Sequence, residues 1–174
     1  GSDAASNAAQ IVLLDSDFSK MPEVVLEGRR VVNNIQTSAS LFLVKNIFSI
    51  LTTVFTLIAA NLYPLYPTQL SLLGAFTIGT PAFFLALQPN KELIRGDFLV
   101  NVILKALPAG LADFIMLAAI SIHGNVLGMS NEQISTVAIV ILLFIGLEAL
   151  VRICRPFDGI RIALCIAMAA GIVV

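Results

Sequence analysis

The chain has 174 residues, of which 58% are hydrophobic and 12% are charged, and its mean hydropathy is +0.96. A water-soluble domain carries about twice that share of charge, so this composition excludes an ordinary soluble protein and indicates an integral membrane protein. The formal net charge is −1 and no basic patch contains interleaved aromatic residues, so we expect no nucleic-acid partner. His123 is the only histidine, which excludes a histidine-rich metal site.

Residues 1–36 form the only segment with a soluble composition. Its short apolar run, Gln10–Leu14, predicts a buried strand of a parallel sheet or the edge of one. Asp17 or Ser19 can cap the helix that follows, and Pro22 suits the first turn of that helix. Because a segment of this size cannot bury a core alone, we interpret it as a strand–helix remnant that closes an α/β domain.

One long helix is expected over Met21–Ala60, because no proline follows Pro22 until Pro64. Its first half is polar and charged, whereas its second half is an apolar run. At about 1.5 Å per residue such a helix is roughly 60 Å long, about twice the thickness of a hydrocarbon core. We therefore predict a rigid link between a cytoplasmic segment, residues 1–36, and a membrane domain, residues 37–174.

Apolar runs of membrane-spanning length recur along the rest of the chain, so the predicted fold is a mainly α, polytopic bundle of about five transmembrane helices. The expected spans are residues 39–60, 69–88, 98–122 and 134–151, and a fifth that begins near Ile160 and is cut off at Val174. Because the chain ends inside this run, we expect it to be a piece of a longer protein.

The basic residues outside the spans all fall on one side of this bundle, whereas the opposite loops, residues 61–68 and 122–133, contain no Lys or Arg. Cytoplasmic loops are enriched in Lys and Arg, so we predict a plasma-membrane protein whose N-terminal segment is cytoplasmic. The residues that set this orientation are Lys20, Arg29, Arg30, Lys91, Arg95, Arg152, Arg155 and Arg161.

Polar and charged residues inside the first predicted span must be explained, because inserting a charged side chain into the membrane costs about 2.5–3.5 kcal/mol. Lys45 either snorkels to the membrane surface or faces the bundle as a fixed positive charge beside a transport path. Asn46 is either a cation ligand or an interhelical hydrogen-bond partner.

The third and fourth spans carry three further ionisable candidates. Lys105 is expected to snorkel to the surface. Asp113 is too short to snorkel and should face the bundle, either in ion passage or as a structural partner of Lys45 or Lys105. Glu148 is expected to pair with Arg152 four residues later, with coordination of an ion as the alternative.

The second span is predicted to be interrupted, since it contains Gly74, Gly79 and Pro81. A proline here removes a donor and clashes with the carbonyl four residues earlier, that of Thr77. Freed carbonyls in a membrane are tolerated where protein, water or an ion satisfies them, as in the broken helices of transporters. We expect residues 74–81 to be locally unwound with backbone oxygens facing the bundle; the alternative is a simple kink.

Four stretches of the sequence resemble motifs of P-type ATPases, and the resemblance covers essentially the whole chain. Gly1–Ala5 and Ala9–Phe18 are similar to G-T-D-V-A and A-D-I-V-L-L-D-D-N-F, which favours the first two residues as native over a cloning scar. Glu27–Ile35 is similar to E-G-R-x-I-Y-x-N-I, which leads into the fifth membrane helix of that family. Gln69–Pro89 is similar to the sixth helix, commonly Q-L-L-W-x-N-L-x-T-D-G-x-P-A.

The resemblance implies the fold and the ATP-driven transport mechanism of this family. Residues 1–36 would close the phosphorylation domain, and the five spans would be helices five to nine. ATP and Mg²⁺ would bind elsewhere in the full-length protein, because the D-K-T-G-T and T-G-D-G-x-N-D loops are absent from this chain. No catalytic residue is therefore expected here. The expected partners are the transported cation, membrane lipid and the remaining domains of the same ATPase.

The sequence also departs from the family at its cation ligands. In calcium and sodium/potassium pumps the sixth helix supplies an Asn and an Asp, and these positions are Gly74 and Ile78 here, while Thr77 is kept. The fifth-helix Asn is kept as Asn46, but the acidic residue three positions later is Ser49. The usual carboxylate cage is missing, so the resemblance leaves the transported ion and any metal ligands unknown.

We therefore predict that the chain supplies the stalk and part of the ion path of a bacterial-type cation pump, which moves cations across the plasma membrane through a phosphoenzyme cycle. The built-in lysine is similar to that of family members with a fixed cation near the path. The alternative is a stand-alone membrane binding or channel-like protein without ATPase activity, which explains the spans but not the motifs. The candidate ion-path residues are Lys45, Asn46, Ser49, Gly74, Thr77, Asp113 and Glu148.

Overall fold

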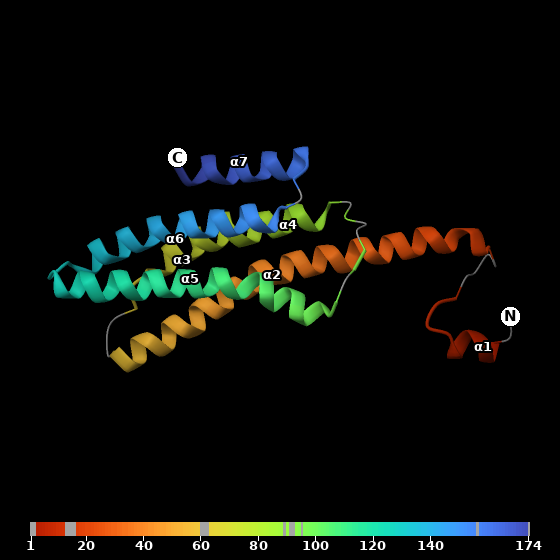
Figure 1. Ribbon diagram of the computed structural model, residues 1–174, viewed down its shortest axis with the longest axis horizontal. Helices are drawn as coiled ribbons and strands as arrows, with labels where there is room; N and C mark the ends of the chain where they lie inside the picture. The colour runs from red at the N-terminus through yellow and green to blue at the C-terminus, as the bar shows by residue number, and fades with distance from the viewer. Residues whose placement is uncertain are drawn as a thin grey trace.

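The computed structural model describes residues 3–12, 17–59, 63–88, 90, 93–94, 96–155 and 157–173, and all regular elements among them are helical. Figure 1 shows a bundle of roughly antiparallel helices, with one helix projecting beyond it toward the N-terminus. In chain order the elements are α1 (Asp3–Ala8), the 3₁₀ turn η1 (Phe18–Lys20), α2 (Met21–Ala59), α3 (Pro67–Gly74), the π-helical turn η2 (Ala75–Gly79), α4 (Thr80–Ala86), α5 (Phe98–Val126), α6 (Asn131–Ile153) and α7 (Gly159–Val173).

Helix α2 is the long helix expected from the sequence. It runs unbroken for 39 residues, or about 58 Å at 1.5 Å per residue, and its polar N-terminal part, residues 21–36, is called the stalk below. Asp17 accepts a hydrogen bond from the Ser19 backbone N–H at 3.0 Å and caps the short turn η1 that leads into the helix. The predicted single helix is confirmed up to Ala59, and Ala60 lies outside the described residues.

The bundle is assembled around α2, which packs along α5 and against α4 and η2, while α5 packs against α6. One buried cluster joins Phe48 of α2 to Leu117 of α5 and Leu142 of α6. A second cluster, nearer the stalk, joins Leu41 to Ile78 and Leu150. The apolar half of α2 is therefore packed against several neighbouring elements of the bundle.

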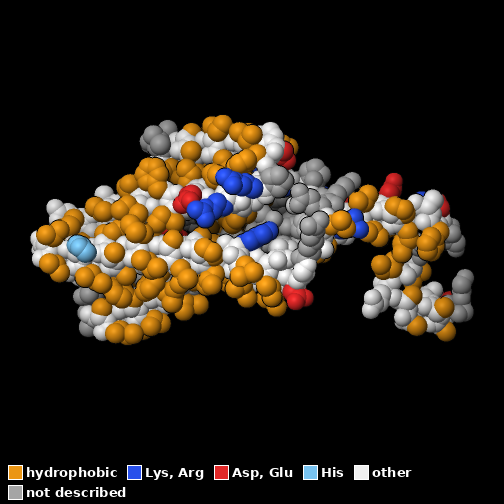
Figure 2. Space-filling model, in the orientation of Figure 1, with side chains coloured by type: hydrophobic (Ala, Val, Ile, Leu, Met, Phe, Trp, Pro, Cys, Tyr) orange, Lys and Arg blue, Asp and Glu red, His pale blue; other side chains and the backbone are white. Residues whose placement is uncertain are grey.

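Four helical segments are long and apolar enough to cross a membrane: residues 18–59, 67–86, 98–126 and 131–153. Helix α7 is apolar but shorter, so the predicted fifth span stays a prediction. Large hydrophobic side chains face outward, for example Leu57, Ile58 and Leu99 at 76%, 81% and 68% exposure. Figure 2 shows hydrophobic side chains spread widely over the viewed face of the bundle away from the stalk, which suits contact with lipid.

The predicted strand at the N-terminus is not found. Gln10–Val12 are irregular, and the side chains of Ile11 and Val12 are 60% and 46% exposed. Leu13 and Leu14, the rest of the predicted strand, lie outside the described residues. A strand needs a neighbouring strand to pair its backbone N–H and C=O groups, and none is present in the described part of the chain. The strand–helix remnant of the predicted fold is therefore not seen.

The second span is interrupted, as the sequence predicts, but it is not unwound. The α-helical pattern of α3 gives way to the π turn η2, and the Thr80 N–H donates to the Ala75 carbonyl, five residues earlier. The widened turn lets Pro81 enter α4 near its first position, where its missing N–H is tolerated. Hydrogen bonds of the i→i−5 type pair backbone groups that unwinding would leave unpaired in lipid, so the expectation of an unwound segment is wrong.

Polar side chains tie the stalk to the ends of three other helices. Asn34 donates to the carbonyls of Ala86, the last residue of α4, and of Gln88, just beyond it, at 2.9 and 2.7 Å. Arg161, near the start of α7, donates to the Gln88 side-chain oxygen at 2.7 Å and to the Cys154 carbonyl at 3.2 Å. These bonds pair backbone carbonyls that the helix ends leave without an intrahelical partner. Together they connect α2 with the ends of α4 and α6 and the start of α7.

Candidate functional site

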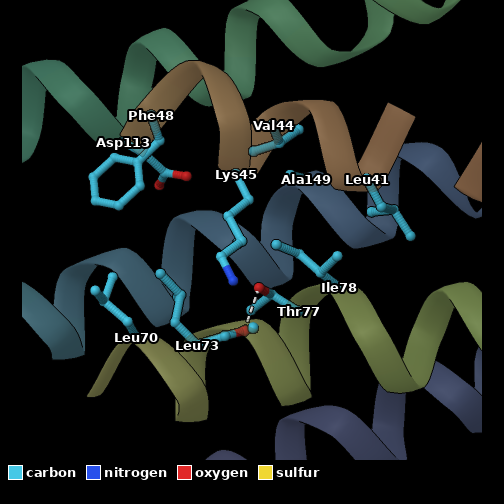
Figure 3. A pocket seen from close by; sticks show the side chains of 12 residues that line it. Leu41, Val44, Lys45, Phe48, Leu70, Leu73, Thr77, Ile78, Asp113 and Ala149 are labelled. Carbon is cyan, nitrogen blue, oxygen red and sulfur yellow. Dashed lines mark hydrogen bonds between the residues drawn. The ribbon is translucent and has the colours of Figure 1, made fainter. Parts of the chain in front are cut away.

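A small cavity lies where α2, α3, η2, α5 and α6 meet, and Figure 3 shows its lining side chains. Its volume is about 20 Å³, which is room for one water-sized occupant. Most of the lining is apolar, and the exceptions among the lining residues are Lys45, Thr77 and Asp113. The structure thus brings three of the polar candidates from three different helical segments to one place.

Asp113 reaches the cavity because α5 approaches α2 unusually closely one turn earlier. A Cβ on Gly110 would lie 2.9 Å from the Ile47 side chain and 3.1 Å from the Val44 carbonyl oxygen, so only glycine permits this contact. The Asp113 side chain is 4% exposed, and its Oδ1 has no hydrogen-bond partner among the described residues. A buried acceptor without a partner is costly, which marks Asp113 as a residue that needs a ligand or a function.

Lys45 extends from α2 toward the second span rather than along its own helix. Its Nζ lies 3.6 Å from where a Cβ on Gly74 would be, and Figure 3 shows the ammonium pointing toward α3 and η2. The ammonium therefore lies beside the second span, while the Lys45 residue as a whole is exposed among the described residues. No ion pair within 4.0 Å joins Lys45 to Asp113 in the described part of the chain, so a direct structural pair between them is not formed.

Thr77 closes the cavity on the side of η2. It is 4% exposed, and its hydroxyl donates to the Leu73 carbonyl at 2.6 Å. Its methyl group is seated against α6, where a Cβ on Gly146 would lie only 2.6 Å away. Gly146 was not among the predicted site residues, although a glycine inside an apolar span is a usual sign of close helix packing.

The other three candidates lie outside the cavity lining. Asn46 is exposed and Ser49 is half-buried on α2. Glu148 pairs with Arg152, whose Nε lies 3.0 Å from the carboxylate oxygen, and both side chains are more than half exposed. The i,i+4 ion pair predicted for Glu148 is confirmed, and Glu148 is not among the residues that line the cavity.

The cavity combines one unpartnered carboxylate with one ammonium and one hydroxyl in apolar surroundings. Such a site can hold a single cation only after that cation has lost most of its water, because the volume admits no hydration shell. No three His, Cys, Asp or Glu side chains of the described residues are grouped as metal ligands. Further oxygen ligands for a bound cation would therefore have to be backbone carbonyls or groups outside this chain.

Comparison with curated proteins gives matches over nearly the whole chain. The calcium-transporting ATPase CtpE of Mycobacterium bovis is 38% identical over 188 aligned residues, which cover 100% of this chain and 24% of that protein. The probable cation-transporting ATPase exp7 of Streptococcus pneumoniae is 35% identical, covering 98% of this chain and 23% of that protein. No protein-family model and no solved structure matches the chain.

The chain is homologous to bacterial cation-transporting P-type ATPases. It spans about a quarter of the length of the curated relatives that it matches. The resemblance inferred from the motifs is thereby confirmed, and with it the membrane location that four apolar helices indicate.

Proposed function

We propose that this chain forms the stalk and part of the ion path of an ATP-driven cation pump of the plasma membrane, with the stalk in the cytoplasm. ATP, Mg²⁺ and the phosphorylated aspartate belong to parts of the full-length protein outside this chain. The chain's own contribution is to bind or guide the cation and to carry movement into the membrane. Homology to P-type ATPases over nearly the whole chain supports this assignment.

The observation that carries the proposal is the unpartnered carboxylate of Asp113 in a cavity between α2 and the second span. An ionised side chain in a membrane helix is costly, and such residues mark ion pathways when they face the bundle interior. A cation in the cavity would give the free oxygen of Asp113 its missing partner. In this role Asp113 is the anionic ligand, and Thr77 and nearby carbonyl groups line the path.

Lys45 supplies the opposing charge. With a cation bound, its ammonium repels that cation and favours its release; without one, the ammonium offsets the charge of the carboxylate across the cavity, without a direct ion pair. Both roles need the ammonium beside the cavity, and its position 3.6 Å from the Cβ site of Gly74 supports this. A side chain at Gly74 would extend toward the ammonium, so glycine keeps that space open.

The stalk provides the mechanical part of the proposal. Helix α2 is one rigid element that carries Lys45 in the bundle and Asn34 at the level of the α4 end. A tilt or rotation of the stalk therefore acts on the cavity from two sides, through Lys45 directly and through α4 and η2. The π turn is a suitable place for such a change, since a widened turn can pass to α-helix without losing its hydrogen bonds.

Calcium is the first ion to test, because CtpE is described as a calcium-transporting ATPase. Ca²⁺ takes six to eight oxygen ligands in flexible geometry, so one carboxylate from this chain would be supplemented by carbonyl groups and by ligands from the rest of the pump. Other cations are tested in parallel, because exp7 is described only as cation-transporting.

The decisive experiment uses the full-length protein in proteoliposomes and measures cation-stimulated ATP hydrolysis and ⁴⁵Ca²⁺ uptake. Asp113→Asn removes the negative charge at nearly constant size, and we expect apparent cation affinity to fall by about 10- to 100-fold, the equivalent of ~1.5–3 kcal/mol for a charged contact. Glu148→Gln is the matched control, since it removes a carboxylate that is exposed and paired outside the cavity.

The outcomes separate the possible functions. Loss of affinity in Asp113→Asn with normal expression supports the proposed ion path. Equal behaviour of the two variants would remove Asp113 from the path. Cation flux without ATP hydrolysis by the full-length protein would instead favour a channel-like protein.

A further inference from the structure

A second, larger hollow lies between α5 and α6, at the end of the bundle nearest the stalk. Its volume is about 330 Å³, within the range of small-ligand sites, and we call it the basic groove. Three basic side chains line it: Lys105 from α5, Arg152 from the last turn of α6, and Arg155 just beyond that helix. Figure 2 shows Lys and Arg side chains gathered on this face of the bundle.

The charges of the basic groove are not cancelled within the described chain. Glu148 pairs with Arg152 and neutralises one of the three cations. Lys105 makes no hydrogen bond or ion pair with any described residue, and Arg155 only approaches the Phe157 ring, with 5.9 Å from its guanidinium carbon to the ring centroid. An excess of positive charge therefore remains, which favours an anionic occupant.

The floor of the same groove is apolar and leads toward the middle of the membrane. Pro108, Ala109 and Ala112 follow Lys105 along α5, and Ile145 faces them from α6. The distance along α5 from Lys105 to Ala112 is about 10 Å. Small side chains on α5 leave this space open, so the hollow is basic at the end near the membrane surface and hydrocarbon-like toward the membrane centre.

We propose that the basic groove binds one anionic phospholipid, with its phosphate among Lys105, Arg152 and Arg155 and the start of an acyl chain along Pro108, Ala109 and Ala112. Basic pockets between membrane helices near the surface suit anionic headgroups. Lys105 lies about 10 Å from the start of α5, a depth from which a long side chain reaches the phosphate level.

This assignment does not depend on the proposed pump function. It needs only that α5 and α6 cross a membrane, and it uses none of the cavity residues Lys45, Thr77 or Asp113. The lipid would hold the ends of α5 and α6 together at a place separate from the Gly146 contact with Thr77 of η2.

The test uses purified full-length protein in detergent, titrated with dioleoyl phosphatidylglycerol and followed by native mass spectrometry. We expect one phosphatidylglycerol molecule to remain bound to the protein in the presence of excess phosphatidylcholine. The double variant Lys105→Gln/Arg155→Gln should weaken its binding by about 25-fold, roughly fivefold per basic side chain. Arg29→Gln, which removes a positive charge from the stalk, is the matched control and should leave retention unchanged.

Two further arms identify the source of the bound phosphate. Ala109→Leu keeps all charges but fills the apolar floor, and it should also weaken phosphatidylglycerol binding. Inorganic phosphate at the same concentration should not compete. The proposal fails if the double variant or Ala109→Leu retains the lipid normally, if Arg29→Gln loses it to the same extent, or if inorganic phosphate displaces it.

Discussion

The inner cavity and the basic groove contain the same kinds of residue in opposite environments. Each has one lysine and one carboxylate, Lys45 with Asp113 and Lys105 with Glu148. Asp113 is 4% exposed with an unpartnered oxygen, whereas the Glu148 side chain is 61% exposed and is paired with Arg152. Burial and pairing, and not residue type, separate a carboxylate that needs a ligand from one that is already satisfied.

The difference has an energetic meaning. An exposed ion pair contributes about 0–1 kcal/mol to the free energy of unfolding, so the pair between Glu148 and Arg152 changes the stability of the protein little. A buried carboxylate without a partner costs several times as much, and a protein keeps it only where it is used. The following changes act on one of the two sites and leave the other intact.

The largest effect is expected from a change in the register of α2, on which the inner cavity is built and the basic groove is not. Inserting two residues after Thr37 rotates the stalk by about 200° relative to the cavity, at ~100° per residue. Full-length protein should then hydrolyse ATP without transporting cations. Uptake and hydrolysis measured together in proteoliposomes check this.

A matched control for the insertion is available in the turn between α5 and α6. Gly128 has φ +69° and nothing within 4 Å of its Cβ position, so two residues added there should be accommodated without loss of coupling. Retained transport after the Thr37 insertion would show that the stalk does not act as a rigid link.

The next largest effect is expected from Gly146→Ala, which fills space beside the inner cavity. The added Cβ would lie 2.6 Å from the Thr77 methyl group, so η2 or α6 must shift. We expect the free energy of unfolding to fall by about 1–3 kcal/mol, with a lower thermal midpoint for the solubilised full-length protein. Gly28→Ala is the control, because nothing lies within 4 Å of that position and alanine is the better helix former. Equal midpoints would mean that α6 and η2 do not pack as described.

A moderate effect is expected from Lys45→Met, which keeps an unbranched side chain only one atom shorter and removes its charge. Without the ammonium, the bound cation loses a repelling neighbour, so apparent cation affinity should rise about tenfold while turnover falls because release slows. Cation titrations of ATP hydrolysis measure both quantities, and expression should be largely unchanged. Lys105→Met should leave both unaltered, since Lys105 lines the basic groove and not the cavity. Unchanged affinity in Lys45→Met would support a lysine that only snorkels.

The smallest effect is expected from Glu148→Gln. The ion pair with Arg152 is exposed, so its loss should change the free energy of unfolding by less than about 1 kcal/mol. Freed from Glu148, Arg152 should strengthen phosphatidylglycerol binding in the basic groove, again measured by native mass spectrometry. A large loss of transport in this variant would show that Glu148, and not only Asp113, belongs to the ion path.

Local features of the molecule could be predicted from the sequence because they depend on neighbours along the chain. The continuity of α2 follows from the absence of proline after its first turn, and helical hydrogen bonds are made within four residues. The pairing of Glu148 with Arg152 follows from their i,i+4 spacing. The interruption near Pro81 follows from its missing N–H, although the π turn that replaces unwinding depends on pairing every backbone group in the span.

Only the tertiary structure decided which candidates meet. The strand expected at Gln10–Leu14 was wrong for the residues described, because a strand depends on a partner that the local sequence does not supply. Lys45, Thr77 and Asp113 share a cavity because Gly110 and Gly146 let α5, α6 and η2 approach closely, whereas Asn46 points elsewhere from the same helix. The sequence by itself determined the helices and their local pairs, and the close packing of those helices selected the residues of the site, since the direction of a side chain across a bundle depends on contacts far apart in the chain.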